Sequence, residues 1–201
     1  MVVFYDIIYL VKTMQKYFVS ASVTYNGKCR ITGSDLHHIR DVMRFGAGQN
    51  VIIGVTEGKT YLGEIEKVGK TVCDILLKEE LPGIFPAYDV TIAQALIRKE
   101  RFELVIEKAA ELGASGIIPT IFDRSVVKLD KDKEDRKLER FRLIAKEASE
   151  QSLRAEIPEI MPYARLEDID YSAYGHVILC YEQDDTDGLL KEIIPTLDKG
   201  K

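Results

Sequence analysis

The stretch that decides the fold of this chain is residues 89–128, DVTIAQALIRKERFELVIEKAAELGASGIIPTIFDRSVVK. Residues 89–97 are rich in apolar and β-branched side chains, which predicts a strand, and residues 99–112 carry apolar side chains near helical spacing, which predicts a helix that Gly113 ends. Residues 116–122 form a second apolar run, in which we expect Pro119 to mark a bulge or a strand end. A strand, a helix and a strand in this order favour a right-handed crossover within a parallel sheet.

An arginine follows each of the two predicted strands, Arg98 after residues 89–97 and Arg124 after residues 116–122. Taken singly, each is more simply a solvated charge or a cation that stabilises a helix end. Ligands of parallel sheets bind beyond the carboxyl ends of the strands. We therefore expect both arginines at one sheet edge, where an anionic ligand would meet them.

Residues 14–80 have a different pattern, typical of a small β-barrel with one helix. Glu57-Gly58 resembles a hairpin turn, and Ser34 and Gly46 are expected to begin and end a helix over residues 34–45. The expected strands are KYFVS, KCRI, NVIIGV, TYLGEIEKV and KTVCDILLK. The side chains that this helix would bury are Leu36, Ile39, Val42 and Met43.

The segment LPGIFP at residues 81–86 marks the expected domain boundary, because its prolines and glycine separate short strands from alternating strands and helices. We expect an N-terminal extension over residues 1–13 and domains over residues 14–82 and 87–201, the second being α/β. The second domain would contain a helix over residues 131–152, a short strand at 159–161, a short helix at 166–174, a buried strand at 176–181 and a helix at 188–197. The residues on the narrow apolar face of the long helix are Leu138, Phe141, Ala145, Ala148 and Ser152.

The composition indicates a globular protein. If this protein binds nucleic acid, the contact must be confined to a small part of its surface. The chain has 201 residues, is 46% hydrophobic and carries a net charge of -5, which argues against indiscriminate coating of nucleic acid. Residues 14–86 hold 9 Lys or Arg and 8 Asp or Glu, whereas residues 87–201 hold 18 and 24. Any contact with nucleic acid must then come from a few Lys or Arg side chains at particular positions. The apolar run at residues 1–13 is too short to span a bilayer, so we expect no membrane partner.

Several familiar kinds of site are not indicated. The Gly46-Ala47-Gly48 segment follows a helix and is more simply a turn than a phosphate loop. His37, His38 and His176 form no metal-ligand spacing, and no G-x-S-x-G segment occurs. The cysteines are far apart and are expected to pack as small buried apolar residues in a reducing cytoplasm; they are Cys29, Cys73 and Cys180.

Three segments carry a resemblance to a known family. LHHIRDVMRFGAGQ, IAQALIRKERFELVIEKAAELGASGIIPTIFDRSVVKL and RFRLIAKEASEQSLRAEIPEI resemble, in order, the signatures of the ribosomal RNA small subunit methyltransferase E family. The resemblance implies methylation of N3 of one uridine in 16S rRNA with S-adenosylmethionine. It also implies a PUA-like RNA-binding barrel over residues 14–82, a cytoplasmic homodimer, and a SPOUT domain over residues 87–201 that is incomplete, because the part that forms the family's trefoil knot is not among these residues.

The family pattern also assigns candidate site residues. Those that would contact the RNA substrate are Lys16, His38, Arg44, Arg98, Arg124, Gln151 and Arg154. Further positions that match the pattern are Gln94, Lys108 and Glu111. Arg98 and Arg124 are also the catalytic candidates, because a cation can stabilise negative charge that develops on the uracil oxygens.

The sequence departs from the family pattern in three places. Leu153 stands where the family usually has glycine, and Lys16 stands where it usually has arginine, which keeps the charge but not the bidentate geometry. The Gly-Pro-Glu-Gly-Gly segment that makes most of the family's cofactor pocket and knot would follow Lys201, so the cofactor-binding residues stay unassigned. The alternative is a non-catalytic RNA-binding module; an unrelated α/β nucleotide-binding protein has little support.

Overall fold

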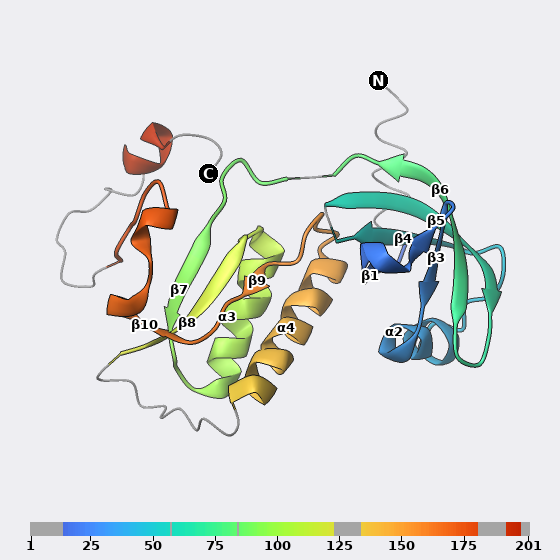
Figure 1. Ribbon diagram of the computed structural model, residues 1–201, viewed down its shortest axis with the longest axis horizontal. Helices are drawn as coiled ribbons and strands as arrows, with labels where there is room; N and C mark the ends of the chain where they lie inside the picture. Colours follow the sequence, from blue (N-terminus) through green and yellow to red (C-terminus); the bar gives the residue numbers. More distant parts are fainter. Residues whose placement is uncertain (1–13, 57, 84, 123–133, 181–191, 198–201) are drawn as a thin grey trace.

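The computed structural model describes residues 14–56, 58–83, 85–122, 134–180 and 192–197 (Figure 1). The expected extension at residues 1–13 and Arg124 lie outside these ranges. The described residues form a six-stranded sheet in the first part of the chain and a four-stranded sheet with two long helices in the second. The architecture is therefore mixed α/β, as predicted.

The first sheet is curled around an apolar core. Its strands are β1 (Lys16–Val19), β2 (Thr24–Tyr25), β3 (Lys28–Ile31), β4 (Asn50–Val55), β5 (Lys59–Val68) and β6 (Cys73–Leu81), with a 3-10 turn at Ala21–Val23. They are ordered β1-β4-β5-β6-β3-β2, and β1 pairs with β4 in parallel while the other pairs are antiparallel. All five expected strands are confirmed. The two-residue turn at Asn26 and Gly27, both with positive φ, adds β2, which the sequence analysis missed.

The helix of the barrel differs from the prediction. It consists of α2 (Gly33–His37) and a π-helical turn (His38–Val42), and its N-cap is Thr32 rather than Ser34. Leu36 and Ile39 are buried as expected. Val42 and Met43 are exposed, because the wider π-helical turn, in which the Met43 amide donates to the His38 carbonyl over 2.8 Å, turns both side chains away from the core.

The second sheet is parallel and confirms the expected strand-helix-strand unit. Its strands are β7 (Thr91–Ala95), β8 (Gly116–Ile121), β9 (Glu159–Ile160) and β10 (Ala164–Arg165), and β8 lies between β7 on one side and β9 and β10 on the other. The helices α3 (Lys99–Leu112) and α4 (Glu134–Gln151) lie side by side (Figure 1). The Phe102 and Phe141 rings join them, with centroids 5.0 Å apart. Gly113 ends α3 with φ of 92°.

Pro119 occupies a different position from the one expected. It pairs with Gln94 inside the β7–β8 ladder rather than at a strand end. On the other side of β8, the β9 pairing stops at Ile117 and the β10 pairing starts at Thr120. The missing amide hydrogen of proline is tolerated there, since the ladder on that side is interrupted.

The end of the chain is less regular than predicted. Short 3-10 turns occur at Leu166–Asp168, Tyr171–Ala173 and Ile194–Thr196. The predicted buried strand is wrong for residues 176–180, where no strand forms and Leu179 is 72% exposed. An apolar run becomes a buried strand only when a neighbour pairs with it, and no described strand does so. Cys180 is consequently exposed, whereas Cys29 and Cys73 are buried as expected.

Helix α4 ends in a Schellman motif centred on Leu153. The Arg154 amide donates to the Ser149 carbonyl over 2.9 Å, and the Leu153 amide donates to the Glu150 carbonyl over 3.3 Å. Leu153 has φ of 58°, the left-handed conformation in which this motif favours glycine. The structure thus explains why glycine is favoured at this position, but it gives no reason for the leucine found here.

We expect Leu153→Gly to stabilise the protein by about 0.5–1 kcal/mol, since relief of left-handed strain outweighs the added chain entropy of glycine. Leu153→Ala is the matched control, because it removes the same packing but keeps the strain. Urea unfolding of both variants measures the difference. A Leu153→Gly protein no more stable than Leu153→Ala would contradict the role assigned to this residue.

Candidate functional site

The carboxyl edge of the parallel sheet presents Arg98 to solvent. Arg98 is the N-cap of α3, three residues after the end of β7 at Ala95, and its side chain makes no capping hydrogen bond. Gln94 is half-buried in β7, and its Nε2 donates to the Ala95 carbonyl over 3.1 Å. Arg98 is therefore at the predicted edge, and its expected neighbour Arg124 lies outside the described residues.

A hollow of about 590 Å³ opens at the same edge, between the first turns of α3 and α4. Its apolar wall includes Leu96, Phe102, Phe141 and Tyr163. The Tyr163 hydroxyl is buried and has no hydrogen-bond partner in the described part of the chain. Burial, with a smaller contribution from the charge of Glu134, raises the pKa of Tyr163 to about 12, so the hydroxyl stays protonated at neutral pH.

The rim of this hollow is predominantly basic. Its charged residues are Lys99, Glu103, Arg136, Lys137, Glu139 and Arg140. Arg140 and Glu103 form an ion pair at 2.5 Å, and the Arg140 hydrogen bond holds the pKa of the Glu103 carboxyl below its usual value. The cationic excess suits a phosphate and does not suit a positively charged sulfonium. The described residues thus provide no fitted pocket for S-adenosylmethionine at this hollow.

The candidates on the barrel are separated from that edge. His38 is half-buried, and its Nδ1 lies 3.0 Å from the Tyr17 hydroxyl. Arg44 follows the π-helical turn with φ of 55° and is exposed, without a hydrogen bond or ion pair to another described residue. Arg44 is therefore available to a phosphate, whereas His38 is partly engaged inside the barrel.

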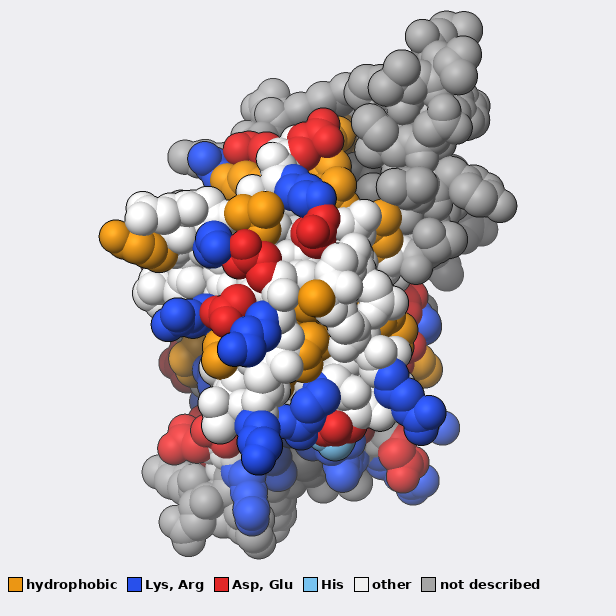
Figure 2. Space-filling view, turned by 90° about the vertical axis from the view of Figure 1, so that its right-hand side faces the viewer, with side chains coloured by type: hydrophobic (Ala, Val, Ile, Leu, Met, Phe, Trp, Pro, Cys, Tyr) orange, Lys and Arg blue, Asp and Glu red, His pale blue; other side chains and the backbone are white. Residues whose placement is uncertain are grey.

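The outer face of the barrel is not a continuous basic patch. Figure 2 shows Lys and Arg side chains interspersed with Asp and Glu. Ion pairs account for much of this mixture, among them Lys28–Glu66 at 2.7 Å, Arg30–Asp74 at 3.0 Å and Lys78–Glu64. This arrangement agrees with the expectation that only a few placed cations contact nucleic acid.

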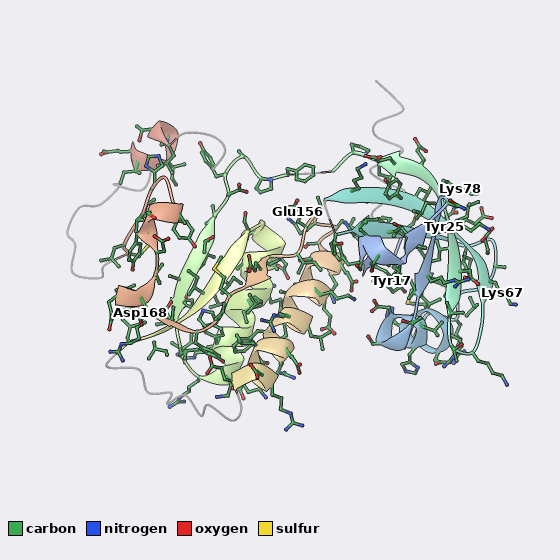
Figure 3. The ribbon with its side chains drawn as sticks, viewed as in Figure 1. Tyr17, Tyr25, Lys67, Lys78, Glu156 and Asp168 are labelled. Carbon is green, nitrogen blue, oxygen red and sulfur yellow. The ribbon has the colours of Figure 1, made fainter. Side chains whose placement is uncertain are left out.

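Lys16 and Arg154 come together, but at the junction between the two sheets. Lys16 is only 1% exposed, and its Nζ donates to the Arg154 carbonyl over 2.5 Å. The Arg154 guanidinium lies against Gly113 at the end of α3, where an added Cβ would be 2.0 Å from Nη2. Such burial disagrees with the phosphate contact expected of Lys16. Figure 3 shows Tyr17 and Glu156 at this junction, on the barrel side and after α4.

The remaining candidates lie on helix surfaces. Gln151 is exposed in the last turn of α4. Lys108 and Glu111 pair with each other at 2.8 Å on the solvent face of α3, near the end opposite Arg98. The two charges neutralise each other, so an ordinary stabilising pair on a helix surface accounts for both residues.

Sequence reasoning missed the polar residues that connect the two parts. Lys146 bridges Asp35 of α2, at 2.9 Å, and Glu150 one turn later in α4, at 2.7 Å. Glu150 is 7% exposed and accepts a hydrogen bond from the Phe18 amide over 3.0 Å. Their spacing of four residues is visible in KEASEQ and predicts that Lys146 and Glu150 pair with each other. Helical periodicity places both on the face opposite the apolar stripe of α4, so the sequence carries no signal that they are buried.

Burial lowers the pKa of the Lys16 ammonium to about 8, from 10.5; the charge of Glu150 opposes this shift and that of Arg154 adds to it. The folded state therefore loses this proton at a lower pH than the unfolded chain, so wild-type stability gains between these two pKa values. We expect the stability of the wild type relative to Lys16→Met to rise by about 1–2 kcal/mol from pH 7 to about pH 9.5.

Urea unfolding at both pH values, with the exposed Lys59→Met as the control, measures this change. A stability difference that stays constant or falls as the pH rises would contradict a buried, desolvated Lys16 ammonium.

Among the described residues, no group of three or more His, Cys, Asp or Glu side chains is placed to hold a metal ion. Within the same residues, none of the helices has the length and hydropathy needed to cross a bilayer.

Two family models match the chain. The RNA methyltransferase domain matches residues 85–199, and the RNA methyltransferase PUA domain matches residues 31–77. Ribosomal RNA small subunit methyltransferase E of Bacillus subtilis is 34% identical over 93% of this chain and 77% of its own length. The Mycobacterium tuberculosis protein of the same name is 31% identical over 65% of this chain, which spans 50% of that relative.

Solved structures agree with these matches. A crystal structure described as a hypothetical protein superposes with a TM-score of 0.82 at 32% identity and covers 93% of this chain and 77% of its own. A Legionella pneumophila protein, solved with the bound cofactor SAM, has a TM-score of 0.70 at 26% identity over 77% of this chain and 64% of its own. Family models match both parts of this chain, and 93% of the chain aligns with the Bacillus subtilis protein at 34% identity. The chain therefore belongs to the ribosomal RNA small subunit methyltransferase E family.

Proposed function

We propose that this protein transfers a methyl group from S-adenosylmethionine to N3 of a uridine in 16S rRNA of the small ribosomal subunit. The observation that carries the proposal is the pair of family matches, in which an RNA methyltransferase domain follows an RNA methyltransferase PUA domain along the chain. The Bacillus subtilis relative supports the class of substrate by its name, and the Legionella pneumophila structure supports the donor by its bound cofactor.

The proposed reaction is a direct methyl transfer. The donor supplies an electrophilic methyl group on a positively charged sulfur; the carbon–sulfur bond breaks as the carbon–nitrogen bond to N3 forms. Neutral uridine carries a proton on N3, which must pass to a base before or during transfer. N3 lies on the pairing edge, so the target base must be unpaired or flipped out of a helix.

Arg98 is the proposed electrostatic catalyst among the described residues. Loss of the N3 proton places negative charge on the uracil oxygens, and a fixed guanidinium beside them lowers the energy of that state. Arg98 is exposed at the carboxyl edge of β7 without a capping hydrogen bond, which leaves its guanidinium available. Arg124 is proposed to act at the same edge, as the family pattern implies.

The basic rim beside Arg98 supports an RNA substrate. Lys99, Arg136 and Lys137 surround an apolar hollow lined by aromatic rings. Cations can hold the phosphates of a single-stranded segment while an unpaired base stacks on an aromatic side chain. The barrel would bind the flanking RNA through Arg44 and, more weakly, His38. Gln151, exposed in the last turn of α4, is a further proposed contact.

Arg44→Ala is expected to weaken binding to small-subunit RNA and to lower the slope of log affinity against log salt by about 1, because one phosphate contact is lost. The affinity for S-adenosylmethionine should stay unchanged. Filter binding across a salt series measures the first and calorimetry the second. Unchanged RNA affinity in Arg44→Ala would contradict the RNA-binding role of the barrel.

The resemblance also motivates the finer features of the proposal. We infer a knotted methyltransferase domain, a homodimer and a cytoplasmic location. Sedimentation of the purified protein tests the dimer, because a monomer at micromolar concentration would contradict it.

The competing function is an RNA-binding module that transfers no methyl group. It is favoured by the cationic rim, which does not suit a sulfonium. Calorimetric titration with S-adenosylmethionine separates the two functions. A complex of micromolar affinity supports the methyltransferase, whereas retention on rRNA without any heat of cofactor binding supports the module.

A further inference from the structure

Strand β1 is the edge of the barrel sheet and is buried against the second half of α4. It comes first in the strand order, with β4 as its only described partner, yet all of its residues are buried. The free edge faces α4 (Figure 1). An edge strand has backbone groups that need partners. Glu150 of α4 supplies one, since its Oε1 accepts from the Phe18 amide over 3.0 Å.

A second bond runs in the opposite direction. Lys16 of β1 donates from Nζ to the Arg154 carbonyl, just after α4, over 2.5 Å. Each part of the molecule therefore directs a buried charged side chain at a backbone atom of the other. The Lys16 ammonium also lies 4.6 Å from the centroid of the Phe18 ring, an attractive cation–π contact.

The surrounding residues are shaped to this arrangement. Gly54 of β4 leaves room for it, because an added Cβ would lie 2.7 Å from the Phe18 ring and 2.9 Å from the Lys16 Cε. The Schellman motif after α4 turns the Arg154 carbonyl toward β1. Lys146 completes the set, holding Glu150 and also reaching Asp35 of the barrel at 2.9 Å.

Buried charges are a costly way to join two surfaces, and apolar side chains of similar volume often give equal or greater stability. Their directional bonds instead fix one geometry among several that apolar packing would allow. We propose that Lys16 and Glu150 are positioning residues, which set the orientation of the RNA-binding barrel relative to the carboxyl edge of β7 and so deliver the bound uridine to the methyl-transfer site. The inference rests on the proposed function.

The test uses Glu150→Ala and Lys16→Met in the full chain, with the exposed Glu147→Ala of the same helix as the matched control. We expect the methylation rate of small ribosomal subunits at saturating substrate to fall about 10- to 100-fold in both variants, as misplacement of reacting groups does. The affinities for RNA and for S-adenosylmethionine, measured separately, should not change. Glu147→Ala should behave as the wild type.

Hydrogen exchange at the Phe18 amide verifies that Glu150→Ala breaks the bond, and small-angle scattering reports the relative placement of the two parts. Faster exchange and a broader distribution of distances in Glu150→Ala support the proposed orientation. If the wild type transfers no methyl group, only the proposed function is contradicted. Faster exchange with an unchanged scattering profile would overturn the proposal, as would an unchanged methylation rate.

If either variant fails to fold, Glu150→Gln and Lys16→Arg replace them. Glutamine keeps the acceptor for the Phe18 amide and arginine keeps a donor for the Arg154 carbonyl. Both should retain most of the wild-type rate, and loss of rate in these folded variants would count against the role of the bonds.

Discussion

Arg98→Ala is expected to lower kcat for methylation of small ribosomal subunits by about 100- to 1,000-fold, the usual effect of removing one preorganised group that stabilises a developing anion. The affinity for RNA should fall much less, since the interaction strengthens only as negative charge develops on the base. Steady-state measurements at saturating RNA and donor give kcat without a contribution from binding.

Arg101→Ala is the matched control for Arg98→Ala. Arg101 is exposed in the first turn of α3, three residues beyond Arg98, and carries the same charge. If the two variants lose activity equally, the effect is one of general charge, and the catalytic assignment of Arg98 does not hold.

Phe102→Ala is expected to destabilise the second part of the molecule by about 3–5 kcal/mol, because it removes a large buried side chain and leaves a cavity. Phe102 is 1% exposed and packs on Phe141, joining α3 to α4 beneath the hollow. The same change removes an aromatic wall of the proposed RNA site. Urea unfolding followed by circular dichroism measures the stability.

Leu104→Ala provides the comparison within the same helix. Leu104 is 51% exposed, so its truncation should change stability by less than about 0.5 kcal/mol. A loss in Phe102→Ala similar to that in Leu104→Ala would mean that α3 does not pack on α4 as described.

Much of the fold could be predicted because local chemistry and long-range packing agree. Residues 99–112 have helical periodicity and Gly113 at the C′ position, and the helix has these bounds in the structure. Where local chemistry and long-range packing disagree, the prediction from sequence was wrong. Residues 176–180 look like a buried strand, but burial requires a pairing partner that the run itself does not specify, and Val42 lost its expected burial to a π-helical turn.

The candidate site was predictable at the sheet edge and not at the junction. Arg98 follows a strand that had to be parallel, so topology alone placed it. Lys16 was expected to contact RNA because the family pattern has a cation at this position, and only the tertiary contact with α4 explains its burial. The apolar hollow likewise depends on how Tyr163 approaches α3 and α4, which no local pattern encodes.

The most direct test of the central claim is the identity of the methylated nucleoside. Small subunits that lack the modification are incubated with the protein and S-adenosylmethionine, and their 16S rRNA is digested to nucleosides for mass spectrometry. The proposed function predicts that N3-methyluridine appears at one equivalent per subunit at most, and only when the donor is present. Unmodified uridine throughout, or a methyl group on another atom, would contradict it.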